Sequence, residues 1–138
     1  MFTGNKIRED SGVLTEEGTT VLLIDDYIPL LNVLKLLLEQ AGYCVMTATD
    51  GDEAIELYKT NPYAIDIVIS DVHMPRVDGV TAFKQMQEID PEVKMLFMSF
   101  DYSKAQEREF LRMGAIGFLE KPFNLPQLQM KLSAAFQH

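Results

Sequence analysis

Short runs of apolar residues recur along this chain, and a longer segment with helical periodicity follows each run. The runs are apolar at consecutive positions and not at alternate ones, which is typical of strands in a parallel sheet that is covered on both faces. The strand candidates are VLLI at 21–24, CVMT at 44–47, IDIVIS at 65–70, MLFMS at 95–99 and GFL at 117–119.

The segments between these runs favour helices. In the first of them, polar Asn32, Lys35 and Glu39 lie on one side and leave a wide apolar face. Asn124 is a typical N-cap for the last helix. The expected helices cover residues 29–42, 50–62, 80–89, 103–113 and the segment from 124 to the end. Five strands that alternate with five helices predict an α/β fold, a doubly wound five-stranded parallel sheet with helices on both faces.

The length of 138 residues, 47% of them apolar, fits one compact domain. We expect this domain to cover residues 21–138. Residues 1–20 are polar and punctuated by glycine, so we expect a flexible leader, a linker or an artificial extension there. The single cysteine, Cys44, excludes an internal disulfide, and its apolar neighbours predict a small core residue.

Acidic residues dominate the charge of the chain. Twenty-one Asp and Glu against twelve Lys and Arg give a net charge of −9, which argues against nucleic acid binding by this domain through backbone phosphates. The sequence shows neither an uncharged apolar run of the roughly eighteen residues that a membrane span needs nor the pattern of a signal peptide. We therefore expect a soluble, cytoplasmic protein that does not bind membranes.

Polar or ionisable residues follow four of the five expected strands: Asp25 and Asp26, Asp71, Ser99 and Lys121. Taken singly, each has a simpler interpretation as a helix cap, a turn residue or a solvated surface charge. In an open parallel sheet, however, strand tips of this kind meet in one crevice. Three carboxylates there would repel one another by about 4 kcal/mol per pair at 4 Å. Lys121 and a hard divalent cation, Mg²⁺ above all, can neutralise them.

Four stretches together resemble the receiver domain of two-component response regulators. They are the acidic pair in VLLIDD, the stretch DVHMPRVDG, the strand-end hydroxyl in MLFMS, and EKPF with Lys121. Their order and spacing agree with that family from residue 21 to about residue 137. The resemblance implies the flavodoxin-like fold, with strand order 2-1-3-4-5, and a cis peptide bond before Pro122.

By this resemblance, Asp71 is the nucleophile that accepts a phosphoryl group. The donor would be a sensor histidine kinase, a phosphotransfer protein or a small acyl phosphate. The resemblance also implies a Mg²⁺ site in which Asp26 and Asp71 are direct ligands. Asp25 would act mostly through water, and the backbone carbonyl of His73 would complete the protein ligands.

The resemblance further implies a switch. Lys121 and Ser99 would contact phosphoryl oxygens, and Phe118 would be the aromatic side chain that moves with Ser99, although a plain core role for Phe118 is the alternative. The output surface would then comprise the fourth helix, the fifth strand and the fifth helix. The sequence does not identify the downstream effector, and a homodimer through this same surface is a further expectation.

Two residues depart from the family pattern. Tyr27 stands beside the acidic pair, where a further polar residue is common. Phe100 follows Ser99 where the family usually has a small residue. A ring of this size is expected to limit access to Asp71, and so to slow phosphorylation, hydrolysis or both.

Other functions fit the sequence less well. A receiver-like interaction module that works without phosphorylation would not need Asp71, Lys121 and the acidic pair. A haloacid-dehalogenase-type phosphatase would need a second Asp two residues after Asp71, where this chain has His73. The glycine-rich motifs of dinucleotide and nucleoside triphosphate sites do not follow any of the expected strands. We therefore expect a signalling switch and not an enzyme.

Overall fold

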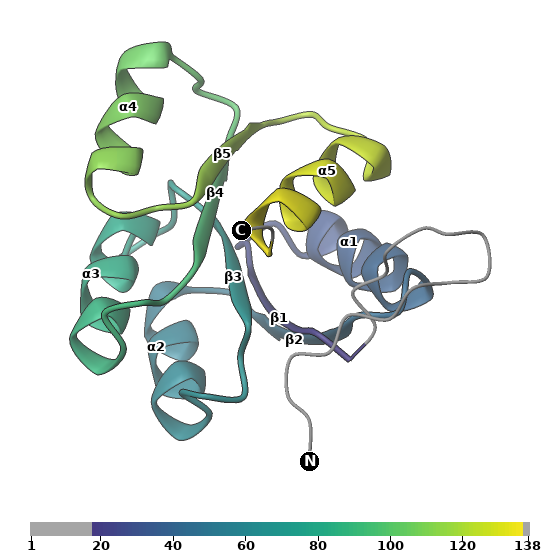
Figure 1. Cartoon of the computed structure of the whole chain (residues 1–138), viewed down its shortest axis with the longest axis horizontal. Helices are drawn as coiled ribbons and strands as arrows, with labels where there is room; N and C mark the ends of the chain where they lie inside the picture. The colour runs from purple at the N-terminus through teal and green to yellow at the C-terminus, as the bar shows by residue number, and fades with distance from the viewer. Residues whose placement is uncertain (1–17, 137–138) are drawn as a thin grey trace.

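The computed structural model describes residues 18–136, which form five strands and five helices in strict alternation (Figure 1). All strands are parallel, in the order β2-β1-β3-β4-β5, so the predicted α/β fold and strand order are confirmed. The strands are β1 Thr20–Ile24, β2 Cys44–Ala48, β3 Ile67–Asp71, β4 Met95–Ser99 and β5 Gly117–Glu120. The helices are α1 Ile28–Gln40, α2 Gly51–Thr60, α3 Gly79–Ile89, α4 Lys104–Arg112 and α5 Leu125–Ala135.

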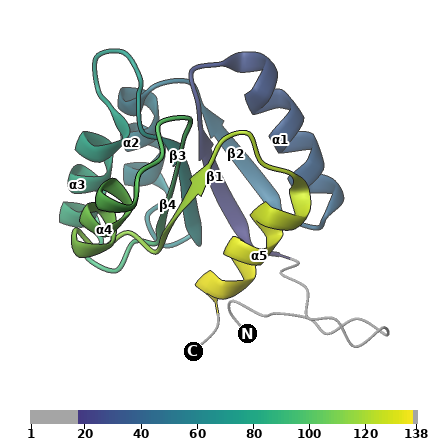
Figure 2. The same cartoon turned by 90° about the horizontal axis from the view of Figure 1, so that it is seen from above.

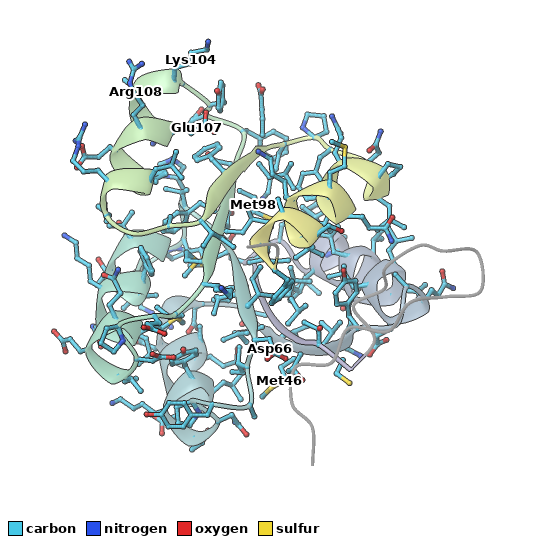
Figure 3. All side chains as sticks on the ribbon, in the orientation of Figure 1. Met46, Asp66, Met98, Lys104, Glu107 and Arg108 are labelled. Atoms are coloured by element: carbon cyan, nitrogen blue, oxygen red, sulfur yellow. The ribbon has the colours of Figure 1, made fainter. Side chains whose placement is uncertain are left out.

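Helices cover both faces of the sheet. α1 and α5 lie on one face, and α2, α3 and α4 lie on the other (Figure 2). Each face has its own buried apolar cluster, because successive side chains of a strand point to opposite sides. Met98 of β4, for example, points toward α5 (Figure 3), whereas its neighbour Phe97 packs in the opposite cluster. Burial on both faces explains why the strand sequences are continuously apolar.

Side-chain caps fix where four of the helices begin. The side chains of Asp50, Asp78, Ser103 and Asn124 each accept a hydrogen bond from a backbone N–H in the first turn of α2, α3, α4 and α5. Asn124 and Gln127 form a reciprocal capping box, so the predicted N-cap of the last helix is confirmed. These caps satisfy N–H groups that would otherwise be unpaired at each helix start.

One sequence expectation is corrected here. Cys44 is exposed and not a core residue, because it begins β2, the strand at the edge of the sheet. Of the described residues before position 21, Thr20 begins β1, and the backbone carbonyl of buried Thr19 accepts the backbone N–H of Cys44. Residues 1–17, most of the expected leader, lie outside the described residues. Within 18–136, the structure has no helix with both the length and the hydropathy that crossing a bilayer requires.

Candidate functional site

Three carboxylates meet at the carboxyl ends of β1 and β3. Asp25 and Asp26 follow β1 directly, and Asp71 is the last residue of β3. Each offers one oxygen to a group in which all oxygens lie within 4.8 Å of one another. Asp25 is fully buried, Asp71 is nearly so, and Asp26 is exposed. The sequence prediction that these strand tips converge is therefore correct.

Lys121 brings positive charge into this group. Its Nζ donates to Oδ2 of Asp25 at 2.7 Å and lies 3.5 Å from Oδ2 of Asp71. The lysine follows β5 and is itself buried, and the peptide bond between Lys121 and Pro122 is cis, as expected. Because Oδ1 of Asp25 accepts the backbone N–H of Tyr27 at 2.8 Å, both oxygens of Asp25 already have donors. Asp25 is thus the fixed counterion of Lys121. The sequence predicted that Lys121 neutralises these carboxylates but not that Asp25 is its main partner.

The surroundings of Asp71 disfavour its charged form. Burial raises the pKa of this carboxyl group, and the negative charge of Asp25 raises it further. The ammonium of Lys121 and the backbone N–H of His73 act in the opposite direction without reversing the rise in the pKa. Any further positive charge that enters the site therefore stabilises the charged form of Asp71.

The oxygens of this group fit a hard divalent cation. Asp26 is exposed and Asp71 lies beside it, so both can offer oxygens of the kind that Mg²⁺ takes as ligands. Asp25 is less available, since its two oxygens accept hydrogen bonds from Tyr27 and Lys121. The structure is consistent with direct ligation by the first two and contact through water by the third.

The loop between β4 and α4 contacts two residues next to this group, Lys121 and His73. Ser99 is buried at the end of β4, and its Oγ accepts the backbone N–H of Asp101 at 3.0 Å. The Asp101 carboxylate lies 3.5 Å from Nε2 of His73, which belongs to the loop after β3. The ring of Phe100 is 67% exposed and lies over the Nζ of Lys121, 5.3 Å from the ring centroid. Asp101 was not singled out from the sequence, where only its place two residues after Ser99 could have suggested a role.

Phe118 of β5 lies between two other aromatic rings. It stacks on Phe110 of α4 with centroids 5.6 Å apart, and Tyr102 meets it edge-on at 5.4 Å. The hydroxyl of Tyr102 donates to Glu107 at 2.6 Å, and Figure 3 labels Glu107 on α4 near this loop. Phe118 is buried in this structure, a position that fits both the switch role and the plain core role.

Ser70 and Gly79 lie against the backbone carbonyl of Asp71. Gly79 ends the stretch DVHMPRVDG, but the sequence analysis assigned neither residue this role. The hydroxyl of buried Ser70 donates to the backbone carbonyl of Asp71 at 2.9 Å. The first residue of α3, Gly79, approaches the same carbonyl so closely that a Cβ there would lie 2.3 Å from the oxygen. Position 79 therefore requires glycine.

Known proteins resemble this chain in both sequence and structure. The sequence profile of the response regulator receiver domain family matches residues 21–133. The chain belongs to this family. The receiver domain is 38% identical to the chemotaxis protein CheY of Thermotoga maritima over 107 residues, which cover 77% of this chain and 88% of that protein. As a receiver domain, it is a module of two-component signalling.

This receiver domain also matches one part of a longer protein and one solved structure. It is 32% identical to the transcriptional regulatory protein ZraR of Klebsiella oxytoca over 125 residues, which are 91% of this chain and 28% of ZraR. The receiver domain thus spans less than a third of that relative. It also matches the crystal structure of the CheX-CheY-BeF3-Mg²⁺ complex from Borrelia burgdorferi, with a TM-score of 0.84, 28% identity and 94% coverage of both chains.

Proposed function

We propose that this receiver domain is a phosphoryl-accepting switch in which Asp71 is the acceptor. The observation that carries the proposal is the position of the Asp71 carboxylate, within reach of both the acidic pair and the Lys121 ammonium. The donor is a phosphohistidine of a sensor histidine kinase or phosphotransfer protein, or a small acyl phosphate. We expect this exchange to take place in the cytoplasm.

The proposed transfer is an in-line displacement. An Oδ of Asp71 forms a bond to phosphorus while the P–N bond of the phosphohistidine breaks, and the electron pair of that bond stays on the imidazole nitrogen. The products are an aspartyl phosphate and a neutral imidazole when the second ring nitrogen of the phosphohistidine carries a proton, which it keeps as the P–N bond breaks. The partly buried position of Asp71 limits the access of water to this acyl phosphate.

Charge neutralisation is the main contribution of the surrounding residues. Mg²⁺ bound by Asp26 and Asp71, with Asp25 through water and the His73 carbonyl as the remaining ligand, would supply two positive charges next to the phosphoryl oxygens. Lys121 supplies a third charge and donates to a phosphoryl oxygen. Buried Ser99 donates to another phosphoryl oxygen, because its Oγ, which accepts the N–H of Asp101, still has its own proton to donate.

The proposed switch follows from a change in charge. Three carboxylates, Mg²⁺ and one ammonium sum to about zero before transfer, and the sum is about −1 when a phosphoryl group of charge near −2 replaces one carboxylate. Ser99 and Lys121 would move toward the new oxygens, and Phe118 would respond through its contact with Tyr102.

The proposed output face consists of α4, β5 and α5. A hollow of about 360 Å³ opens there, lined by Tyr102, Glu107, Phe118 and Lys131 among others. Because Phe118 and Lys121 both line this hollow, a change at the site alters its wall directly. A downstream effector or a second copy of the chain is the proposed occupant of the face, and we expect this domain not to bind nucleic acid.

The direct test is the intact mass of the purified protein after incubation with acetyl phosphate, with and without Mg²⁺. We expect one phosphoryl adduct that requires Mg²⁺ and disappears in Asp71→Asn. Asp78→Asn is the matched control, because Asp78 is an exposed carboxylate that caps α3, and it should still form the adduct. If a folded wild-type protein forms no adduct, the alternative of a phosphorylation-independent interaction module is favoured.

A further inference from the structure

The contact between Phe100 and Lys121 is not explained by burial. The Phe100 side chain is 67% exposed, so removal of apolar surface from water holds it only weakly. Among the described residues 18–136, its ring has no contact with another aromatic ring. The group that the ring does meet is the Lys121 ammonium, 5.3 Å from the ring centroid. This distance is typical of a cation–π interaction.

We propose that Phe100 is a positioning residue for Lys121: its ring holds the ammonium against Asp25, and a phosphoryl group on Asp71 must displace the ring. This inference rests on the proposed function and deepens it. It differs from the steric role expected from the sequence, because what acts here is the π face of the ring and not its bulk.

The contacts of the ammonium show why the ring and a phosphoryl oxygen compete. Nζ donates to Asp25 at 2.7 Å, whereas 3.5 Å separates it from the Asp71 oxygen. Lys121 is buried, and the exposed ring covers it at the rim of the site. Because Asp25 and the ring contact the same ammonium, the ring adds stability to the unphosphorylated arrangement. When Lys121 turns to a phosphoryl oxygen, this added stability is lost.

The residues next to Phe100 connect this displacement to the rest of the domain. Asp101 contacts Ser99 and His73, and Tyr102 contacts both Phe118 and Glu107. Phe100, Asp101 and Tyr102 thus connect one loop to Lys121, to the loop after β3, and to α4 and β5. Loss of the contact between Phe100 and Lys121 therefore loosens a segment that reaches the proposed output face.

The test compares Phe100→Leu, Phe100→Ala and Phe100→Tyr. Leucine keeps apolar bulk without a π face, alanine removes both, and tyrosine keeps the π face. We expect Leu and Ala to form the acetyl phosphate adduct faster than wild type by a similar factor of about two to five, and Tyr to match wild type. In the unphosphorylated protein, the NMR signals of the Lys121 ε-protons should move downfield in Leu and Ala, and stay in place in Tyr, because the ring shields them.

Other outcomes overturn the proposal. If Leu behaves as wild type and only Ala is faster, the bulk of the side chain is what matters. If Leu and Ala are both slower, the ring favours transfer and does not compete with it. The NMR comparison separates this inference from the proposed function, since it needs no phosphorylation. Lys121 signals that do not move in Leu exclude the contact even if wild type forms no adduct.

Discussion

A buried ion pair organises the site at the scale of single residues. Asp25 and Lys121 lie 96 residues apart in the chain, and both side chains are almost entirely buried. A buried charge without a counterion is costly, so each of these side chains depends on the other. The pair also leaves the oxygens of Asp26 and Asp71 available to other ligands.

Loss of the lysine is expected to destabilise the fold. Lys121→Met leaves Asp25 buried without its counterion, which should lower the free energy of unfolding by about 3–5 kcal/mol in urea denaturation. Lys35→Met is the matched control, because Lys35 pairs with Glu39 at the surface of α1 and should cost less than about 1 kcal/mol. Equal losses in the two variants would show that the buried pair has no special role.

The raised pKa of Asp71 gives stability a dependence on pH. A carboxyl group whose pKa is higher in the folded state opposes folding at neutral pH, and this penalty declines as the pH falls through the raised pKa and is absent below the ordinary pKa. Asp71→Asn should therefore raise the melting temperature at pH 7 to 8 in the absence of divalent cations. The gain should shrink as the pH falls. A variant that melts below wild type at pH 7 would contradict the assignment.

The sequence predicted which residues meet at this site better than it predicted their contacts. Strand ends can be located from apolar runs, and parallel topology then brings Asp25, Asp71 and Lys121 together. The contacts of His73 and Phe100 depend on the conformations of two loops, which no periodicity reveals. The core interpretation of Cys44 was wrong because apolar neighbours do not distinguish an edge strand from a central one.

At the scale of elements, α3 begins against the backbone of β3. The backbone N–H of Gly79 donates to the carbonyl of Val72 at 2.9 Å, and its Cα faces the carbonyl of Asp71. Helix positions were predicted well, and the N-cap Asn124 is visible in the sequence. The bounds of β4 were also predicted correctly, but β3 extends one residue further than expected, through Asp71, because that residue still pairs with Met98 of β4.

Gly79→Ala should disturb both the helix and the acceptor. The new Cβ would lie 2.3 Å from the Asp71 carbonyl oxygen, so the start of α3 or the end of β3 must shift. We expect a loss of about 1–3 kcal/mol in stability and slower formation of the acetyl phosphate adduct. Thr81→Ala, an exposed substitution in the same turn, is the control. An adduct rate equal to wild type in Gly79→Ala would show that the acceptor tolerates this shift.

At the scale of the whole molecule, the sheet separates two apolar clusters that lie under different helices. Ile55 of α2 packs in the cluster beneath α2, α3 and α4, and Ile67 of β3 packs in the cluster beneath α1 and α5. Both clusters are built on the same five strands, so neither can be lost while the sheet remains intact. The two layers should unfold together.

Ile55→Val and Ile67→Val test this arrangement. Each should cost about 0.5–1.5 kcal/mol, and the double variant should show the sum to within about 0.5 kcal/mol, because the side chains lie on opposite faces. Circular dichroism and tyrosine fluorescence should give one coincident transition in urea for all variants. Two separate transitions would mean that the layers are independent.

The edge position of Cys44 has a practical consequence. It is the only cysteine in the chain, it is exposed, and it begins β2, whereas the carboxylates lie at the opposite ends of the strands. A thiol-reactive linker would therefore attach the protein to a solid support in a single orientation. The phosphoryl site would then face the solution, where donors and effectors can be added and washed away.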